Sequence, residues 1–477
     1  MKEGYIKAEN RKKILLLTDD IRVHSGVAQI GREMIIHTAH RYNWCQLAGA
    51  VQHPDKNKCV KLDDEINKQT GLNDAFCNLY PVDGYGNPDI LRHVIKREQP
   101  DAIFLITDPR YFEWVFRIEN ELRQKCPIIY LNIWDDVPAP MYNKEFYESC
   151  DLLMGISKQT VNINKMVLGN KAKDKIIEYV PHGLNNKMFF PIEDQNDKNL
   201  KGLRDQLWLG KDFEFSLLFN SRNIRRKCII STIIAWKLFT ESLPKEEAEK
   251  CLLILHTEAI ADPGTDLQAC IEYFLNPKIS KIRISEQKLP TESMNLLYNS
   301  VDGVILLSNA EGWGLALTEA MLTGTPFIAT VTGGMQDQMR FIDDKGNWIE
   351  FNSDVPSNHR GTYKECGEWA LPVFPKVMSS VGSPLTPYIY EDHMDHEDAA
   401  ERIMELYKMG NKKRKEIGKK GLEWALGDEA GFTSEKMSNR MMKHIDTLFN
   451  TWKPRKKYEF LKDTDYEPRV IPHKLIY

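Results

Sequence analysis

Length and composition already restrict the class of protein. The chain has 477 residues, about three times the size of a typical single domain, so we expect at least two domains. Hydrophobic residues make up 42% and charged residues 28%, which is typical of soluble globular proteins and excludes disordered and fibrous classes. Lys and Arg total 64 against 68 Asp and Glu, a formal net charge of -4, so the chain as a whole is not a strongly basic nucleic-acid binder.

Cysteine spacing and apolar runs bear on the compartment. The nine Cys residues are scattered without a C-x-x-C pair, which excludes a zinc ribbon or thioredoxin-like motif built from sequence neighbours. No apolar run is long enough to span a membrane, and the first run, residues 14–18, has no signal-peptide cleavage pattern behind it. We therefore expect a reduced, cytoplasmic protein; attachment to a membrane surface stays open.

The first half of the chain alternates short apolar runs with helical patterns. The runs cover residues 14–18, 102–106, 128–133 and 152–154, and residues 27–42 carry apolar side chains at helical spacing. This alternation predicts a parallel, doubly wound α/β sheet. The pattern breaks near residues 179–183, so we expect an N-terminal Rossmann-like domain over residues 1–195.

A second alternating series predicts a second Rossmann-like domain over residues 196–430. Its apolar runs are residues 215–219, 252–255, 304–307 and 327–329. Residues from about 345 to 395 are rich in Pro, Gly and aromatic side chains without a period, and we interpret them as an inserted loop region. Residues 431–477 are expected to form a helical tail that returns to the N-terminal domain. Two such domains predict a ligand-binding cleft between them.

Two acids and two glycines follow the apolar run at residues 304–307. Glu311, Gly312, Gly314 and Glu319 lie in one strand-loop-helix turn that continues through Leu315. Glycines let backbone approach a ligand, free amides at a helix start donate to oxygens, and carboxylates accept from hydroxyls. The pattern fits a polyhydroxylated ligand, but a plain turn with Glu319 in an early helical turn fits it as well.

Cations follow the apolar run at residues 215–219. Arg222 and Lys227 stand in the polar segment that starts at Asn220 and contains Ser221. Cations at the carboxyl end of a parallel strand favour an anionic ligand such as a diphosphate, although a solvated basic loop is the commoner cause of a charge run. Gly26, between the first strand and the first helix, is weak support for a phosphate site.

In order and spacing these motifs resemble the GT-B glycosyltransferases, specifically the large retaining family four (glycosyltransferases group 1). Glu311 and Glu319 stand in the E-x7-E arrangement of that family, and Arg222 and Lys227 match its R-x4-K pair. Residues 296–302 resemble the helix before the signature, residues 333–334 the glycine pair after it, and residues 180–185 the end of the acceptor domain. The resemblance covers most of the chain and implies a GT-B fold, with two Rossmann-like domains facing a cleft.

The resemblance also implies roles for single residues. Arg222 and Lys227 would bind and stabilise the leaving diphosphate, Glu319 would hold the ribose, and Glu311 would contact the transferred sugar. The other donor-binding positions that it implies are Gly26, Ser221, Gly312, Gly314 and Leu315. The family transfers sugar with retention of configuration and without a metal or other cofactor, and family frequency favours a UDP-sugar donor.

The chain departs from the family at one point. Family members often carry a His in the N-terminal domain after a strand near the reacting sugar, whereas the comparable strand ends here carry Asp108 and Asp135. Either Asp could take the polar role of that His, and each could instead be an ordinary helix cap.

Three functions follow as hypotheses. The leading one is a retaining glycosyltransferase that acts on a hydroxyl of a glycan, lipid or small molecule. A non-catalytic nucleotide-sugar-binding protein is the second. The third is a DNA-modifying glycosyltransferase for hydroxymethylated pyrimidines, because residues 382–392 resemble stretches in phage-encoded members of the family. The basic residues 453–457 favour DNA, and the net charge of -4 opposes it.

Overall fold

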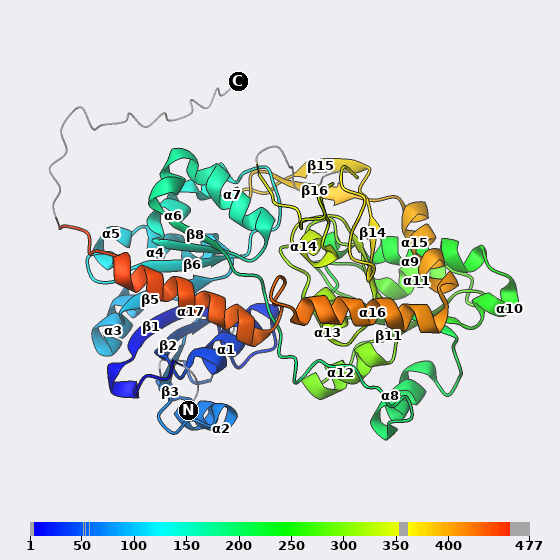
Figure 1. Ribbon diagram of the computed structural model, residues 1–477, viewed down its shortest axis with the longest axis horizontal. Coiled ribbons are helices and arrows are strands. Elements are labelled where there is room, and N and C mark those ends of the chain that lie inside the picture. Colours follow the sequence, from blue (N-terminus) through cyan, green and yellow to red (C-terminus); the bar gives the residue numbers. More distant parts are fainter. Residues whose placement is uncertain (1–3, 51, 53, 57, 353–360, 458–477) are drawn as a thin grey trace.

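The computed structural model describes residues 4–50, 52, 54–56, 58–352 and 361–457. These residues form two lobes, each built around a parallel sheet (Figure 1). The N-terminal domain occupies the left lobe in blue and cyan, and the C-terminal domain occupies the right lobe in green and yellow (Figure 1).

The N-terminal domain has an eight-stranded sheet in the order β3-β4-β2-β1-β5-β6-β7-β8. All neighbours are parallel except β3 and β4. Its strands are β1 (Lys12–Asp19), β2 (Tyr42–Gly49), β3 (Val60–Lys61), β4 (Cys77–Pro81), β5 (Ala102–Ile106), β6 (Ile128–Asn132), β7 (Leu152–Gly155) and β8 (Ile176–Tyr179). Its helices are α1 (Gly26–Thr38), α2 (Asp63–Thr70), α3 (Pro88–Glu98), α4 (Glu113–Phe116), α5 (Glu119–Leu122), α6 (Lys144–Ser149) and α7 (Lys158–Leu168).

The apolar run in β1 explains why this strand lies inside the sheet with both of its faces covered. Ile14 and Leu16 belong to one buried cluster, whereas Leu15 and Leu17 belong to another. Successive side chains of a strand point to opposite faces, so both faces of β1 are covered. A continuous apolar run is what a strand buried on both faces requires.

The C-terminal domain has a six-stranded parallel sheet in the order β11-β10-β9-β12-β13-β14. Its strands are β9 (Phe215–Asn220), β10 (Cys251–His256), β11 (Lys281–Ser285), β12 (Gly303–Leu306), β13 (Phe327–Thr330) and β14 (Ala370–Val373), and a separate hairpin consists of β15 (Val377–Val381) and β16 (Ile389–His393). Its helices are α8 (Lys198–Trp208), α9 (Ile229–Glu241), α10 (Lys245–Ala248), α11 (Leu267–Phe274), α12 (Thr291–Asn299), α13 (Leu315–Leu322), α14 (Met335–Met339), α15 (His396–Lys408) and α16 (Gly410–Leu426).

The stretch from about 345 to 395, expected to be an inserted loop, contains regular structure. Strand β14 completes the C-terminal sheet, and β15 and β16 form an antiparallel hairpin. Leu371 and Val373 of β14 are buried, but Pro372 interrupts the apolar run and the strand is short. The sequence pattern therefore hid a strand that belongs to the core of the domain.

The chain crosses between the domains twice, at one place. Leu184, after the N-terminal sheet, pairs with Thr433 in an isolated parallel bridge. A side chain at Gly183 would collide with the carbonyl of Thr433, so the two crossings lie in direct contact. The second crossing leads into α17 (Ser434–Thr451), which packs on α1, β7 and β8 of the N-terminal domain. This helix is the orange-red one across the left lobe (Figure 1).

The order of the strands also determines where the loops that carry the sequence motifs lie. In each sheet the order reverses beside the first strand of the domain, between β1 and β5 and between β9 and β12. Ligands of open α/β sheets bind beyond the carboxyl ends of the strands at such switch points. The loops after β1, β5, β9 and β12 are therefore the places where a ligand is expected. As to membranes, no helix within the described ranges combines the length and apolarity needed for a span.

Candidate active site

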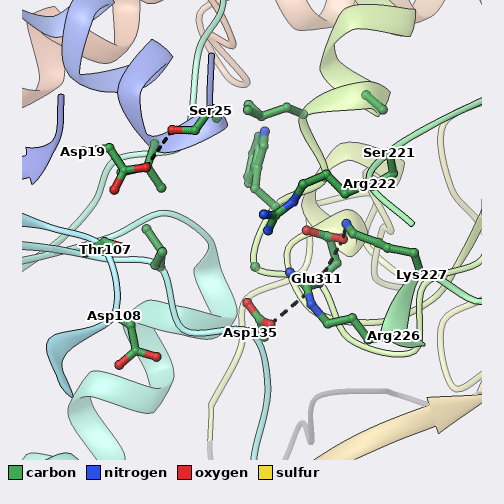
Figure 2. Close-up of a pocket in the computed structure, with 18 of the residues that line it drawn as sticks. Asp19, Ser25, Thr107, Asp108, Asp135, Ser221, Arg222, Arg226, Lys227 and Glu311 are labelled. Carbon is green, nitrogen blue, oxygen red and sulfur yellow. Dashed lines mark hydrogen bonds and ion pairs between the residues drawn. The ribbon is translucent and has the colours of Figure 1, made fainter. Parts of the chain in front are cut away.

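A cleft of about 1590 Å³ lies between the two domains, at the carboxyl ends of both sheets. Its walls include every residue that the sequence singled out as catalytic or donor-binding. These are Gly26, Asp108, Asp135, Ser221, Arg222, Lys227, Glu311, Gly312, Gly314, Leu315 and Glu319. Figure 2 shows how the labelled ones face each other across the cleft, with Arg222, Lys227 and Glu311 on one side and Asp19, Thr107 and Asp108 on the other.

The loop after β9 and the loop after β12 meet in a cluster of opposite charges. Lys227 is buried and forms an ion pair with Oε2 of Glu311, which is also buried. Nη1 of Arg226 lies 3.2 Å from the same oxygen and donates to the carbonyl of Ala310 at 2.6 Å. Burial alone raises the pKa of Glu311, but Lys227 and Arg226 outweigh it and lower that pKa to about 2. Glu311 is therefore a carboxylate at neutral pH.

Arg222 is exposed and lines the cleft, as Arg225 does, but the two side chains differ in their partners. Arg225 is engaged with Glu391 through Nη2–Oε1 at 2.8 Å and Nη1–Oε2 at 3.1 Å. Arg226 and Lys227 are engaged with Glu311. Arg222, in contrast, forms no ion pair with any residue that the structure describes. The segment thus offers one uncommitted guanidinium to an anion in the cleft.

Glu319 lines the cleft from α13 in the C-terminal domain. Its Oε2 accepts a hydrogen bond from the Tyr298 hydroxyl and one from Nδ2 of Asn220 at 3.3 Å. Burial raises the pKa of Glu319 to about 7, against the opposing effect of these two hydrogen bonds. Among the residues that the structure describes, no cation forms an ion pair with this carboxyl as Lys227 does with Glu311. The two acids of the E-x7-E pair therefore differ in charge state near neutral pH.

Two helices begin at the cleft. Helix α1 starts at Gly26, where the Ser25 side chain caps it by accepting from the amide of Ala28 at 3.0 Å. Helix α13 starts at Leu315 after Gly314, whose φ of 83° is in the left-handed region that favours glycine. A Cβ on Gly26 would lie 3.1 Å from Cδ1 of Leu315, so the two starts approach closely. Both direct unpaired amides and the positive ends of their dipoles toward one space.

Glycines let the domains touch beside this site. A Cβ on Gly312 would lie 2.7 Å from the carbonyl of Ile133 and 3.0 Å from Oδ1 of Asp135. Gly333, with φ of 50°, has no room for a Cβ because the carbonyl of Glu311 fills the position. These residues hold the Glu311 loop against the N-terminal domain, so their small size has a packing reason as well as a ligand-binding one.

The two Asp candidates in the N-terminal domain have different surroundings. Oδ1 of Asp108 caps the short 3-10 helix Pro109–Phe112 and accepts from Nε of Arg110 at 2.7 Å. Asp135 lies across the cleft from the cations that follow β9, with Oδ2 3.8 Å from Nη1 of Arg226. Burial raises the pKa of Asp135, partly offset by Arg226. Asp108 is thus committed to local structure, and Asp135 faces Arg226 beside Glu311 (Figure 2).

The β15–β16 hairpin closes one side of the cleft. Glu391 on β16 holds Arg225, and the amide of Tyr390 donates to the carbonyl of Val137 in the N-terminal domain at 2.9 Å. At the hairpin tip the side chain of Thr386 accepts from Arg110. The hairpin therefore joins the loop after β9 to the opposite wall of the cleft.

Sequence reasoning missed several groups in this site. Arg226 stands in the polar segment that starts at Asn220, but only the fold shows that it lies between Glu311 and Asp135 and contacts both. Tyr298 and Asn220 carry no motif that marks them as partners of Glu319. His182 lines the cleft beside Trp313, and burial lowers the pKa of this imidazole to about 3. A His just before the glycine at the domain crossing was the available signal.

Metal ligation has no cluster to support it in the described ranges, where no group of three His, Cys, Asp or Glu side chains is placed to hold an ion. In each of the acidic pairs Asp19–Asp20 and Asp135–Asp136, the second carboxylate is engaged by neighbouring groups of the N-terminal domain. Asp20 is fully buried and binds Arg22. Asp136 points inward and accepts from the amide of Val137 and from Gln159.

Part of the sequence resembles known proteins, and the fold of nearly the whole chain resembles solved structures. Residues 282–357, which contain Glu311 and Glu319, match the family described as Glycosyl transferases group 1. Mannosylfructose-phosphate synthase of Agrobacterium fabrum is 22% identical over 197 residues, which cover 40% of this chain and 39% of that protein. The match thus spans well under half of that curated relative.

Solved structures resemble nearly the whole chain. Sucrose-phosphate synthase from Thermosynechococcus elongatus superposes with a TM-score of 0.63 at 16% identity, covering 92% of this chain and all of that one. The Anabaena HepE protein in complex with UDP and glucose gives a TM-score of 0.61 at 14% identity over the same shares. These likenesses confirm the predicted GT-B fold. The residues that match the Glycosyl transferases group 1 family, 282–357, thus lie in the C-terminal half of a chain with the GT-B fold.

Proposed function

We propose that this protein is a retaining glycosyltransferase that moves a sugar from a UDP-sugar to an acceptor hydroxyl without a metal ion. The observation that carries the proposal is the convergence of Arg222, Lys227, Glu311 and Glu319 with two helix starts in one interdomain cleft. Cations and free amides suit a diphosphate, and acids beside them suit sugar hydroxyls. The HepE protein that this chain resembles is described in complex with UDP and glucose, which supports the donor class.

In this proposal the donor lies along the C-terminal wall. The ribose hydroxyls donate to Glu319, and the diphosphate lies between the start of α13 and the exposed guanidinium of Arg222. Lys227 then divides its charge between Glu311 and the leaving phosphate. Negative charge grows on that phosphate as the bond to the sugar breaks, so fixed cations stabilise the transition state more than the bound donor. This is the work that a divalent metal performs in other transferases.

The acceptor enters from the N-terminal wall. Asp135 is the candidate for the polar group that faces the sugar, since it replaces the family His and Asp108 is taken by Arg110. Its raised pKa fits an acid that holds a hydroxyl hydrogen bond in either protonation state. Retention is proposed on family resemblance, with the leaving phosphate taking the acceptor proton on the same face of the sugar.

A turnover assay separates this proposal from a non-catalytic nucleotide-sugar-binding protein. Wild-type protein is incubated with a panel of UDP-sugars, and UDP release is followed with and without sugar acceptors. A transferase releases UDP faster with an acceptor, whereas a binding protein is stabilised by the donor without releasing UDP. Arg222→Ala should lose the activity. Arg117→Ala is a matched control, because Arg117 is an exposed Arg directly after α4 and outside the cleft. No stimulation by any acceptor would contradict the transferase assignment.

A further inference from the structure

Tyr111 stands out among the large apolar side chains because it is exposed inside the cleft. Its side chain is 55% exposed and lines the acceptor-side wall. One face of its ring is stacked on Tyr85, with centroids 4.6 Å apart and planes inclined by 29°. An aromatic ring that is covered on one face and open on the other is a platform for a flat partner.

The platform is held in place from behind. The Tyr85 hydroxyl donates to Oδ1 of Asp19 at 2.7 Å, and the ring meets Phe112 edge to face. A Cβ on Gly49 would lie 2.8 Å from Cδ1 of Tyr85, so the glycine makes room for this ring. Thr107, just before the 3-10 helix that carries Tyr111, has a φ of 111°, which is rare for a residue with a side chain. A strained turn and the contacts of Tyr85 with Asp19 and Phe112 thus position an exposed ring.

Charge on this wall selects among partners. Its Arg side chains are Arg22 and Arg110, and both are neutralised by acids in the described structure: Nη2 of Arg22 lies 2.7 Å from Asp20, and Nε of Arg110 lies 2.7 Å from Asp108. Asp135 adds a further acid. The uncommitted guanidinium of the cleft, Arg222, is on the donor wall. The acceptor wall therefore lacks a free fixed cation for a phosphate, within the part of the chain that the structure describes.

We infer that the acceptor is an uncharged sugar whose ring stacks on Tyr111, and that sugar phosphates and nucleic acids are poor acceptors. The C–H face of a sugar ring is apolar and packs on an aromatic ring, while its hydroxyls reach the carboxylates at the edge. A phosphate group on this wall would face the carboxyl of Asp135, while Arg22 and Arg110 are already paired with Asp20 and Asp108, and repulsion between like charges would cost affinity. This inference rests on the proposed transferase function and adds the acceptor class to it.

The test compares acceptors that differ in charge. With a UDP-sugar that the protein binds, transfer is measured at pH 8 to glucose, maltose, glucose 6-phosphate and an oligonucleotide with 5-hydroxymethylcytosine. We expect kcat/KM for at least one neutral sugar to exceed that for glucose 6-phosphate by about tenfold or more, as a lost counter-charge implies. Preference for the sugar phosphate or for the oligonucleotide, or no transfer to a neutral sugar, would overturn the inference.

Variants connect that preference to the named residues. Tyr111→Ala should raise the acceptor KM about tenfold with the donor KM unchanged, and Tyr111→Phe, which keeps the ring, should stay near wild type. Tyr273→Ala is the control, since Tyr273 is 83% exposed and lies outside the cleft. Asp108→Asn should free Arg110 and raise the ratio of glucose 6-phosphate to glucose transfer. An unchanged acceptor KM in Tyr111→Ala would show that the acceptor does not stack on the Tyr111 ring.

Measurements of donor binding distinguish a failure of the proposed transferase function from a failure of the acceptor inference alone. Calorimetric titration with UDP and with each UDP-sugar is carried out on the same preparations. A protein that binds none of them contradicts the proposed transferase function, and the acceptor inference falls with it. A protein that binds a donor but fails the acceptor tests contradicts the acceptor inference alone.

Discussion

Donor affinity should depend on the ionisation of Glu319. The carboxyl has a pKa of about 7 in the ligand-free protein, and the ribose hydroxyls of the donor need it as an acceptor. An ionised carboxylate accepts more strongly than a protonated one. With a pKa near 7 the ionised fraction falls from about nine tenths at pH 8 to about one tenth at pH 6. The dissociation constant for UDP-glucose should therefore rise about ninefold over that range, or roughly 1.3 kcal/mol.

Isothermal titration calorimetry measures this effect directly. UDP-glucose is the suitable probe, because its diphosphate has no terminal group that titrates between pH 6 and pH 8. Binding at pH 7 should also release about half a proton, as a group half protonated before binding becomes ionised. Titrations in two buffers with different ionisation enthalpies measure that release.

Two variants decide whether Glu319 is the titrating group. Glu319→Gln should bind UDP-glucose weakly and with the same affinity at pH 6 and pH 8. Tyr298→Phe removes the hydroxyl that stabilises the carboxylate, so its pH curve should shift to higher pH. Asp337 also has a pKa of about 7, but it lies outside the cleft lining, and Asp337→Asn is the control. An undiminished ninefold change in Glu319→Gln would show that a group other than Glu319 controls the pH dependence of binding.

Three further predictions concern the charged cluster, its packing and metals. Lys227→Ala and Arg222→Ala should each cost about 2–4 kcal/mol of transition-state stabilisation in kcat, measured as UDP release; near-wild-type turnover in both would show that other groups stabilise the leaving diphosphate. Gly333→Ala should destabilise the protein by about 2–3 kcal/mol through its clash with the Glu311 carbonyl, lowering the unfolding midpoint by roughly 5–10 °C; an unchanged midpoint by calorimetry would mean that the loop adapts freely. Activity should survive EDTA, and loss that Mg²⁺ or Mn²⁺ restores would mean that the diphosphate is bound through a metal.

The GT-B fold could be predicted because its central strands are buried on both faces. Their apolar runs, such as residues 14–18 and 304–307, are continuous and end at polar loops. Strand β2 escaped the same reasoning because Asn43 and Gln46 interrupt it. Gln46 is fully buried, and its Nε2 donates to the carbonyl of Asp19 at 2.7 Å. A satisfied polar side chain in a core strand resembles a loop residue when only the sequence is known.

Residues of the candidate site could be predicted where chain spacing alone brings them together. The loops after β9 and β12 each follow a strand, and both strands belong to the switch point of one sheet. The ion-pair partner of each cation could not be predicted, because Arg225, Arg226 and Lys227 contact their carboxylates only in the folded chain. Glu391, which binds Arg225, comes from the hairpin that the sequence presented as part of a loop region.

The acceptor side was the least predictable part. Asp108 and Asp135 follow strands in the same way, and only the structure separates a residue bound to Arg110 from one that faces Arg226. The aromatic residues Tyr111 and Trp134 likewise follow the strands β5 and β6. The structure buries Trp134 and leaves Tyr111 exposed in the cleft. Exposure depends on packing between distant segments, which residue patterns do not record.

A nucleotide sugar should bind between the two domains with its diphosphate on the cations after β9. A crystal structure of the protein with UDP-glucose would show this binding mode. We expect the ribose on Glu319, the diphosphate between Arg222, Lys227 and the start of α13, and the glucose toward Glu311 and Asp135. A donor bound outside the cleft, or in the cleft with its diphosphate away from Arg222 and Lys227, would contradict it.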